Sequence, residues 1–270
     1  MSFIEALILG LVQGLTEFLP VSSSAHVQIA QELLDLSELS RPQLTAFIAI
    51  IQLGTELAVL LYFAGDIVRI IKSWTTNGFQ KFSTQPAESR LGWLVIIGTI
   101  PIVALGLMFE SQIENELRSL TVIGFALIIF GIALGLADWL GPKTRDISDI
   151  RLKDGVLIGL GQAMALIPGV SRSGGSITVG RMLGLTREAA TRFSFLIAIP
   201  AVLGAGFYQF LSSYSDLPPE LLISTLIATA VSFLVGYAVI ALLLAYVKRG
   251  SFLPFVIWRV AVGVFVLTLV

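Results

Sequence analysis

Two short polar segments carry the side chains that could do chemistry, and the first contains a glutamate, three serines and a histidine within ten residues. Residues 13–26 read QGLTEFLPVSSSAH, and His26 is the only histidine in the chain. Gln13 and Glu17 are four residues apart, so they share one face of a helix. Ionisable residues within a membrane are costly and usually functional, which makes Glu17 and His26 candidate site residues. The alternative is that both lie at a segment end and simply meet water.

The second segment, residues 167–176, reads IPGVSRSGGS. An arginine between serines and glycines suits phosphate binding, because the planar guanidinium donates paired hydrogen bonds to phosphate oxygens. Glycines let backbone N–H groups approach, and a helix over about 176–183 would direct its N-terminal N–H groups at the same anion. A helix that starts near Ser24 gives the first segment the same capacity. The alternative is a cytoplasmic loop in which Arg172 meets lipid headgroups.

The composition of the whole chain is that of an integral membrane protein. Of 270 residues, 56% are apolar and 13% are charged, whereas soluble domains carry about 25% charged residues. This excludes a soluble enzyme, a nucleic-acid-binding protein and a disordered chain, and the absence of cysteine excludes disulfides and thiolate sites. Residues 1–26 lack the Lys or Arg of a secretory signal peptide, so we expect them in the mature protein. We predict a single integral membrane domain over residues 1–270.

Six apolar runs are long enough to cross a bilayer as helices. Two shorter runs each stop at a proline followed by serine and glycine. Non-helical backbone at membrane depth must be buried in protein or line a wet cavity, so we interpret the short runs as re-entrant helical hairpins. The predicted fold is an all-α polytopic membrane protein with six transmembrane helices and two re-entrant hairpins. The six spans are 43–63, 91–109, 120–140, 190–211, 220–247 and 252–270, and the short runs are 3–19 and 155–168.

The distribution of Lys and Arg fixes the orientation of these spans. Basic residues concentrate in the connections 64–90 and 141–154 and at 248–249, whereas 110–119 has one and 212–219 has none. Since cytoplasmic loops carry the excess of positive charge, the basic connections are expected inside and both termini outside. The first re-entrant hairpin then enters from the outside and the second from the cytoplasm.

The two hairpins also resemble each other in sequence. Two similar segments of opposite orientation indicate an inverted-topology repeat, about 1–140 against about 150–270, and such repeats bind substrate near the bilayer midplane. With a shift of 149 positions, Gly10-Leu11, Gln13, Val21-Ser22 and Ser24 match Gly159-Leu160, Gln162, Val170-Ser171 and Ser173.

Over essentially its full length, the chain resembles the undecaprenyl-pyrophosphate phosphatase family, also called the bacitracin-resistance proteins. The resemblance rests on residues 13–26 and 168–174, with further similarity at 51–54 and 193–196. It implies a bacterial inner-membrane hydrolase, dependent on Mg²⁺ or Ca²⁺, that removes the terminal phosphate of a C55 isoprenyl diphosphate. It also implies interlocked inverted repeats, a site open to the periplasm and a homodimer. The product would be the carrier lipid for cell-wall precursors, and consumption of the diphosphate would explain bacitracin resistance.

The resemblance assigns roles to individual positions. It makes Glu17 a metal ligand, Arg172 a phosphate-binding residue, Ser23 the candidate nucleophile, and His26 the base or the proton donor to the leaving lipid phosphate. Direct attack by water, with Ser23 only as a ligand, stays open. The first acid of the family's Glu-x-x-x-Glu pattern is Gln13 here; its carbonyl oxygen can bind a hard cation, but one formal charge is missing. Further substrate contacts are expected from Thr16, Ser22, Ser171, Ser173 and Gly174.

Two other functional classes fit part of the pattern. A secondary transporter or lipid flippase would share inverted repeats and a midplane anion site, but would not need a nucleophile, a histidine and an acid in one segment. An intramembrane serine protease using Ser23 and His26 would leave Arg172 unexplained. Glu56 lies within a predicted span and either joins the site as an acid or faces a cavity beside a helix-packing Gly54-Thr55 pair. Arg259 and Glu188 are expected to snorkel or to lie at the interface.

Overall fold

The fold is built from α-helices. A computed structural model describes residues 1–34, 36, 39–109, 112–113, 117, 119–142 and 144–270, and within these ranges it contains helices and no strand. The predicted all-α class is confirmed. The helices are α1 Phe3–Thr16, α2 Ser23–Leu33, α3 Arg41–Tyr62, α4 Ala64–Asn77, α5 Ala87–Met108, α7 Leu120–Leu140, α8 Leu152–Ala163, α9 Arg172–Met182, α10 Arg187–Ser213, α11 Leu222–Val247 and α12 Leu253–Leu267.

Within the described residues, five helical segments are long and apolar enough to cross a membrane. This confirms a polytopic membrane protein. The sixth predicted span contains α12, which has 15 residues. At about 1.5 Å per residue it extends roughly 22 Å, less than the ~30 Å hydrocarbon core, so helix length supports five of the six predicted spans. The five are Arg41–Tyr62, Ala87–Met108, Leu120–Leu140, Arg187–Asp216 and Pro219–Val247.

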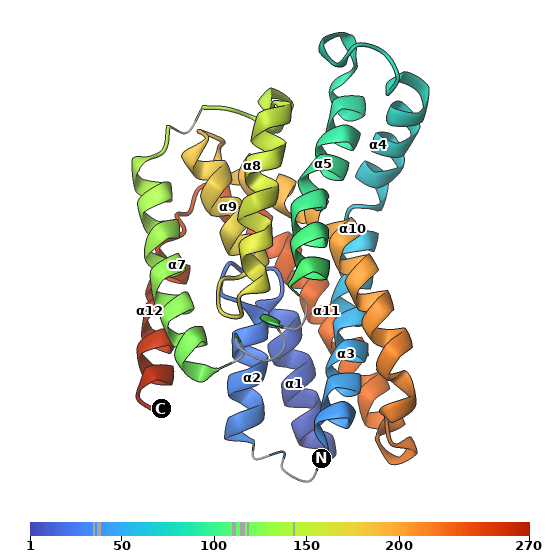
Figure 1. The fold of residues 1–270 in the computed structure, drawn as a ribbon, viewed down its shortest axis with the longest axis vertical. Helices are drawn as coiled ribbons and strands as arrows, with labels where there is room; N and C mark the ends of the chain where they lie inside the picture. The colour runs from blue at the N-terminus through green and yellow to red at the C-terminus, as the bar shows by residue number, and fades with distance from the viewer. Residues whose placement is uncertain (35, 37–38, 110–111, 114–116, 118, 143) are drawn as a thin grey trace.

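Both short apolar runs end at a turn, as their prolines and serines predict. α1 ends at Thr16, and the chain reverses through residues 17–22 into α2. α8 passes through a 3₁₀ turn at Met164–Leu166 and reverses through residues 167–171 into α9. Figure 1 shows α1 and α2 at the lower end of the molecule, α8 and α9 reaching down from the upper end, and the two turns meeting near mid-height.

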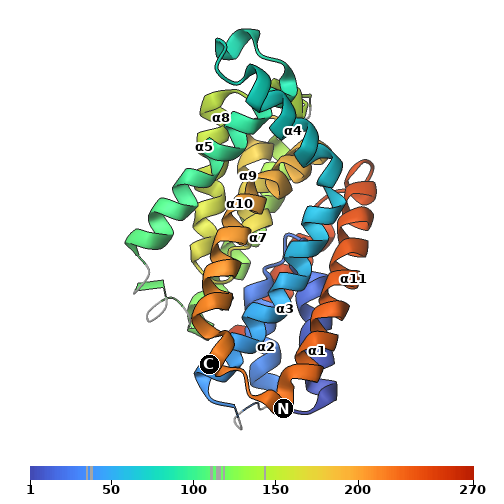
Figure 2. The ribbon, with the colours of Figure 1, turned by 90° about the vertical axis from the view of Figure 1, so that its right-hand side faces the viewer.

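Each of these short hairpins packs against a long helix from the other half of the chain. α1 lies on α11, and α8 lies on α5; Figure 2 shows α1 beside α11. The contacts are close because both hairpins present a glycine: a Cβ on Gly10 would lie 2.5 Å from the Ala228 carbonyl oxygen, and one on Gly159 would lie 2.4 Å from the Gly98 carbonyl oxygen. Gly10 and Gly159 are 149 positions apart, the same spacing that relates the two polar segments.

A buried ion cluster fixes the upper ends of four helices. Asp138 of α7 accepts from the Nε of Arg181 on α9 at 3.1 Å and from the Nε and Nη2 of Arg187 on α10 at 2.7 and 3.0 Å. It also accepts from the backbone N–H of Phe252, which leads into α12. Arg181 has no exposed surface. The cluster therefore holds the C-terminal part of α9, and with it the second turn, in a fixed frame.

Candidate active site

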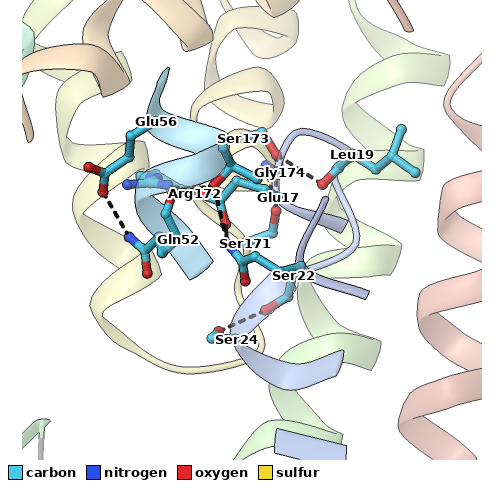
Figure 3. Close-up of polar contacts among 12 residues, drawn as sticks. Glu17, Leu19, Ser22, Ser24, Gln52, Glu56, Ser171, Arg172, Ser173 and Gly174 are labelled. Atoms are coloured by element: carbon cyan, nitrogen blue, oxygen red, sulfur yellow. Dashed lines mark hydrogen bonds and ion pairs between the residues drawn. The ribbon is translucent and has the colours of Figure 1, made fainter. Parts of the chain in front are cut away.

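The two polar turns touch each other although they are about 150 residues apart in the sequence. Arg172, at the start of α9, forms an ion pair with Glu17 in the turn that follows α1. Ser173 Oγ donates to the Leu19 carbonyl oxygen at 3.1 Å. Figure 3 shows these contacts joining the two turns. The structure thus brings Glu17 and Arg172, the two charged residues that the sequence singles out in separate segments, into one site.

A pocket opens beside this ion pair. Its lining combines charged and polar side chains with apolar ones, which suits a molecule with a charged head and a hydrocarbon tail. α3 and α10 complete the walls supplied by the two turns. The lining residues are Glu17, Phe18, Thr55, Glu56, Val59, Arg172, Ser173, Ser194, Phe195, Ala198 and Val202.

Glu17 is held from two sides. Its side chain is 6% exposed, and Gln13 Nε2 donates to its Oε2 at 2.9 Å while Arg172 pairs with its Oε1. The prediction that Gln13 and Glu17 share a helix face is therefore confirmed. The Gln13 amide also donates to Thr55 Oγ1 on α3 at 3.4 Å. Thr16, by contrast, donates to the Val12 carbonyl oxygen within α1 and is not among the residues that line the pocket.

The two turns end in the same unusual backbone conformation. Ser22 has φ = 75° and Ser171 has φ = 72°, and they are the non-glycine residues with positive φ in the described chain. Such conformations cost of order 1–3 kcal/mol and persist where the surroundings impose them, often at functional sites. In each turn the serine hydroxyl lies 3.2 Å from that of the serine two positions later, Ser24 or Ser173.

The hydroxyl of Ser171 also caps α9. It accepts from the backbone N–H of Gly174 at 3.1 Å. Of the predicted phosphate ligands in this turn, Gly174 therefore already has a partner for its N–H, whereas Arg172 and Ser173 present side chains to the pocket. α9 still directs its remaining N-terminal N–H groups and the positive end of its dipole toward the site.

Arg259 on α12 is a site residue whose role the sequence did not reveal. The expectation that it snorkels is wrong: it has no exposed surface. Its Nη2 donates to the carbonyl oxygens of Gly169 and Val170, both at 2.9 Å, and its Nη1 donates to that of Pro20 at 3.2 Å. These carbonyl oxygens lie in the turns and have no helical hydrogen-bond partner within the described residues. The guanidinium of Arg259 therefore provides hydrogen-bond donors to the backbone of both turns. The only sequence signal was an arginine in the middle of an apolar run.

Glu188, the second residue expected at an interface, does lie in an exposed position. Its side chain is 45% exposed, and its carboxylate lies 3.6 Å from the Nζ of Lys248.

His26 has both ring nitrogens occupied. Its Nδ1 lies 2.8 Å from the Ser22 carbonyl oxygen, which can only accept, so Nδ1 carries the proton. The indole N–H of Trp258 donates to Nε2 at 2.8 Å, so Nε2 carries the lone pair and the imidazole is neutral. Burial, together with the positive charge of Arg259, lowers the pKa of His26, although the bond to the Ser22 carbonyl acts in the opposite direction.

His26 does not share a pocket with the ion pair, since it is not among the residues that line the pocket of Glu17 and Arg172. Ser23, at the first position of α2, is partly exposed, and neither ring nitrogen of His26 is bonded to it. Any proton transfer that uses the Nε2 of His26 therefore requires Trp258 to give up its hydrogen bond.

Glu56 lies in the pocket, and the Gly54-Thr55 pair packs against α11 and α1. Glu56 is 4% exposed and accepts from Gln52 Nε2 at 3.2 Å. A Cβ on Gly54 would lie 2.2 Å from Ser232 Oγ on α11, which makes this glycine a packing residue. The alternative of a helix-packing Gly54-Thr55 pair with Glu56 facing a cavity is therefore confirmed, whereas a role of Glu56 as an acid of the site stays a prediction. Figure 3 shows the guanidinium of Arg172 directed toward Glu56.

Comparison with known proteins places this site in context. The sequence model of the family described as bacitracin resistance protein BacA matches residues 6–265. A protein of Agrobacterium fabrum named undecaprenyl-diphosphatase 2 is 51% identical over 269 residues, which cover 100% of this chain and 96% of that protein. A Micrococcus luteus protein named undecaprenyl-diphosphatase is 51% identical over 270 residues, which cover 97% of this chain and 95% of that protein. A similarly named protein of Nocardioides sp. is 49% identical over 272 residues, covering 99% and 96%.

Proposed function

The chain belongs to the bacitracin resistance protein BacA family, and from this premise we propose that it is a membrane phosphatase that hydrolyses undecaprenyl diphosphate to undecaprenyl phosphate and inorganic phosphate. The product would return to cell-wall synthesis as a carrier lipid. The observation that carries the proposal is the Glu17–Arg172 pair across the two turns, beside a pocket lined by both polar and apolar side chains.

Arg172 and the N-terminus of α9 bind the diphosphate in this proposal. The guanidinium is paired with Glu17 in the described structure, so the arriving phosphate oxygens compete with Glu17 for it. Paired hydrogen bonds from arginine to phosphate, together with the helix N-terminus, stabilise the charge that develops on the transferred phosphoryl group. The prenyl chain lies against the apolar lining residues, which include Phe18, Phe195 and Val202.

Hydrolysis needs an oxygen nucleophile, a proton acceptor and a proton donor. The nucleophile attacks the terminal phosphorus, the bond from that phosphorus to the bridging oxygen breaks, and the lipid monophosphate leaves with the bridging oxygen. We assign the nucleophile to Ser23, followed by hydrolysis of the phosphoserine, or to a water molecule positioned beside Ser23. His26 accepts or returns the proton at Nε2 once Trp258 has released that nitrogen.

The residues present fit a Mg²⁺ or Ca²⁺ ion. Hard cations prefer oxygen ligands, and Mg²⁺ usually takes one or two carboxylates together with substrate phosphates and water. Glu17 would provide a carboxylate and Gln13 an amide oxygen. No group of three or more His, Cys, Asp or Glu side chains suited to a metal occurs within the described residues, which agrees with a site completed by the substrate. When bound, the ion neutralises phosphate charge.

We also propose that the two halves form inverted repeats, that the site opens to the periplasm, and that the protein is a homodimer in the inner membrane. The equivalent positions of Gly10 and Gly159, the matching conformations of Ser22 and Ser171, and the exchange of α1 and α8 between the halves support the repeat. In Figure 1 the connection between α4 and α5 lies at the upper end and both chain termini lie in the lower half, as the distribution of basic residues requires.

Phosphate release tests the activity. Purified protein in detergent with a prenyl diphosphate and Mg²⁺ should release inorganic phosphate, and Arg172→Ala and Glu17→Ala should each lower kcat/KM by about 10²-fold or more, the usual effect of removing a group that stabilises the transition state. Arg249→Ala, which changes an exposed arginine, is the control. Absence of release by the native protein, or full activity of both variants, would disprove the phosphatase. Lipid movement between bilayer leaflets without release would indicate a flippase instead.

A further inference from the structure

The side chains that line the pocket carry more negative charge than the proposed roles of Glu17 and Arg172 explain. Among the described residues that line it, Glu17 and Glu56 are acidic and Arg172 is the one basic residue, so their formal charges sum to −1. Arg172 is already paired with Glu17. A diphosphate headgroup is itself an anion, so its binding here needs further positive charge.

Glu56 is the unexplained residue. It is 4% exposed on α3, and its described hydrogen bond comes from the neutral amide of Gln52. None of the ion pairs formed by the described residues includes Glu56. Arg172 also faces Glu56 (Figure 3), but it is paired with Glu17, and one guanidinium does not compensate two buried carboxylates. Glu56 therefore either stays protonated or has a cation partner that arrives with the ligand.

The carboxylate of Glu56 occupies the space between α3 and α10. α10 passes it at Gly206, where a Cβ would lie 2.1 Å from Glu56 Oε1, so a side chain at that position would require the carboxylate to move. The amide nitrogen of Gln13 donates to Glu17 Oε2 at 2.9 Å and to Oγ1 of Thr55, the residue next to Glu56 in the sequence, at 3.4 Å. The side chain of Gln13 therefore bridges α1 and α3, in contact with Glu17 and with the sequence neighbour of Glu56.

We propose that Glu56 supplies the second carboxylate of the divalent-cation site, opposite Glu17, in place of the charge that Gln13 lacks. The inference rests on the proposed function, since it concerns the cation that binds with the diphosphate. Two carboxylates from α1 and α3 give a dication two charged oxygen ligands, and Arg172 then becomes free for the phosphate oxygens. In this proposal α3 contributes a cation ligand in addition to lining the pocket.

Binding of Mn²⁺ in the absence of lipid tests this directly, because Mn²⁺ takes the same oxygen ligands and its free concentration is measurable by electron paramagnetic resonance. Glu56→Gln should weaken Mn²⁺ binding at least tenfold, abolish the rise in melting temperature that Mg²⁺ causes, and raise the melting temperature of the metal-free protein. Gln13→Glu combined with Glu56→Gln returns a carboxylate to the site and should restore Mn²⁺ binding. Glu188→Gln, at an exposed carboxylate, is the matched control.

The outcomes separate this inference from the proposed function. Unchanged Mn²⁺ affinity in Glu56→Gln would overturn the inference and indicate that Glu56 is a protonated acid. A double variant that folds but does not regain Mn²⁺ binding would also overturn it. Should the double variant not fold, Gln13→Glu alone must tighten Mn²⁺ binding, and no change would overturn the proposal. Phosphate release by the native protein is a separate measurement. If the native protein releases phosphate but Glu56→Gln binds Mn²⁺ as well as the native protein does, the proposed phosphatase activity stands and only the metal-binding role of Glu56 is disproved.

Discussion

Trp258 and Arg259, adjacent on α12, act on the two turns through different chemistry. Arg259 donates to main-chain carbonyls of both turns, and Trp258 donates to the side chain of His26. Neither residue belongs to the two polar segments that the sequence singles out. One short helix therefore fixes the backbone of the site and the protonation state of its histidine.

Replacement of Arg259 should destabilise the protein as well as inactivate it. Arg259→Met leaves the carbonyls of Pro20, Gly169 and Val170 buried without a donor, at about 1–3 kcal/mol for each unsatisfied group. Arg259→Lys keeps the charge but lacks the planar fork, so it should recover only part of the loss. Thermal unfolding in detergent measures both, with Arg249→Met as the exposed control. Equal melting temperatures for Arg259→Met and the control would refute this role.

Trp258→Phe should move the pH dependence of phosphate release. The indole N–H stabilises neutral His26, so its loss should raise the pKa of His26. Since a base works only while neutral, activity falls as the pH drops through that pKa, and the acid limb of kcat/KM should shift to higher pH by about 0.4–1 unit. This follows from a net hydrogen-bond contribution of about 0.5–1.5 kcal/mol and 1.36 kcal/mol per pKa unit. An acid limb unchanged in Trp258→Phe would show that Trp258 does not influence the base.

Residue types predicted Glu17 and Arg172 as partners in function, because a carboxylate and an arginine in broken membrane helices have few other uses. The same reasoning misjudged Arg259, since its partners are main-chain carbonyls, which have no signature in the sequence. Trp258 was not singled out, because only the fold brings its indole from α12 to His26 on α2.

At the scale of elements, the hairpins depend on glycine contacts as much as on their polar turns. Proline and serine predicted where α1 and α8 stop, and hydropathy predicted the long helices. The partners of the hairpins were not predictable, because α1 lies on α11 and α8 on α5, far away in the chain. An apolar run shows that a helix is surrounded by lipid or by protein, but it does not specify which helix packs against it.

Gly159→Ala should destabilise the protein by about 1–3 kcal/mol, the usual cost of overpacking, because its Cβ would lie 2.4 Å from the Gly98 carbonyl oxygen and force α8 away from α5. Gly204→Ala is the matched control: nothing lies within 4 Å of its Cβ, and alanine in a helix interior should stabilise α10 by up to about 1 kcal/mol. Thermal unfolding of the two variants should thus shift in opposite directions. A shift in the same direction would contradict the close packing of α8 on α5.

At the scale of the whole molecule, the charged residues fall mainly into three groups. Most Lys and Arg lie in the predicted connections, on which the proposed orientation rests. Asp138, Arg181 and Arg187 form the buried ion cluster, and Glu17, Glu56, Arg172 and Arg259 are gathered where the two hairpins meet α3 and α12. The first group was readable from the sequence because it depends on charge counts alone, whereas the other two required the fold, since their members come from different helices and turns.

The proposed orientation predicts which exposed positions can be reached from outside the cell. The chain has no cysteine, so single cysteines can be introduced without removing native ones. Ser215→Cys, in the connection without basic residues, should react with a membrane-impermeant maleimide in intact cells. Lys81→Cys, in the basic connection between α4 and α5, should react only after the membrane is disrupted; both positions are exposed in the fold. The reverse labelling pattern would invert the protein in the membrane and place the mouth of the pocket on the cytoplasmic side, where a periplasmic diphosphate could not enter.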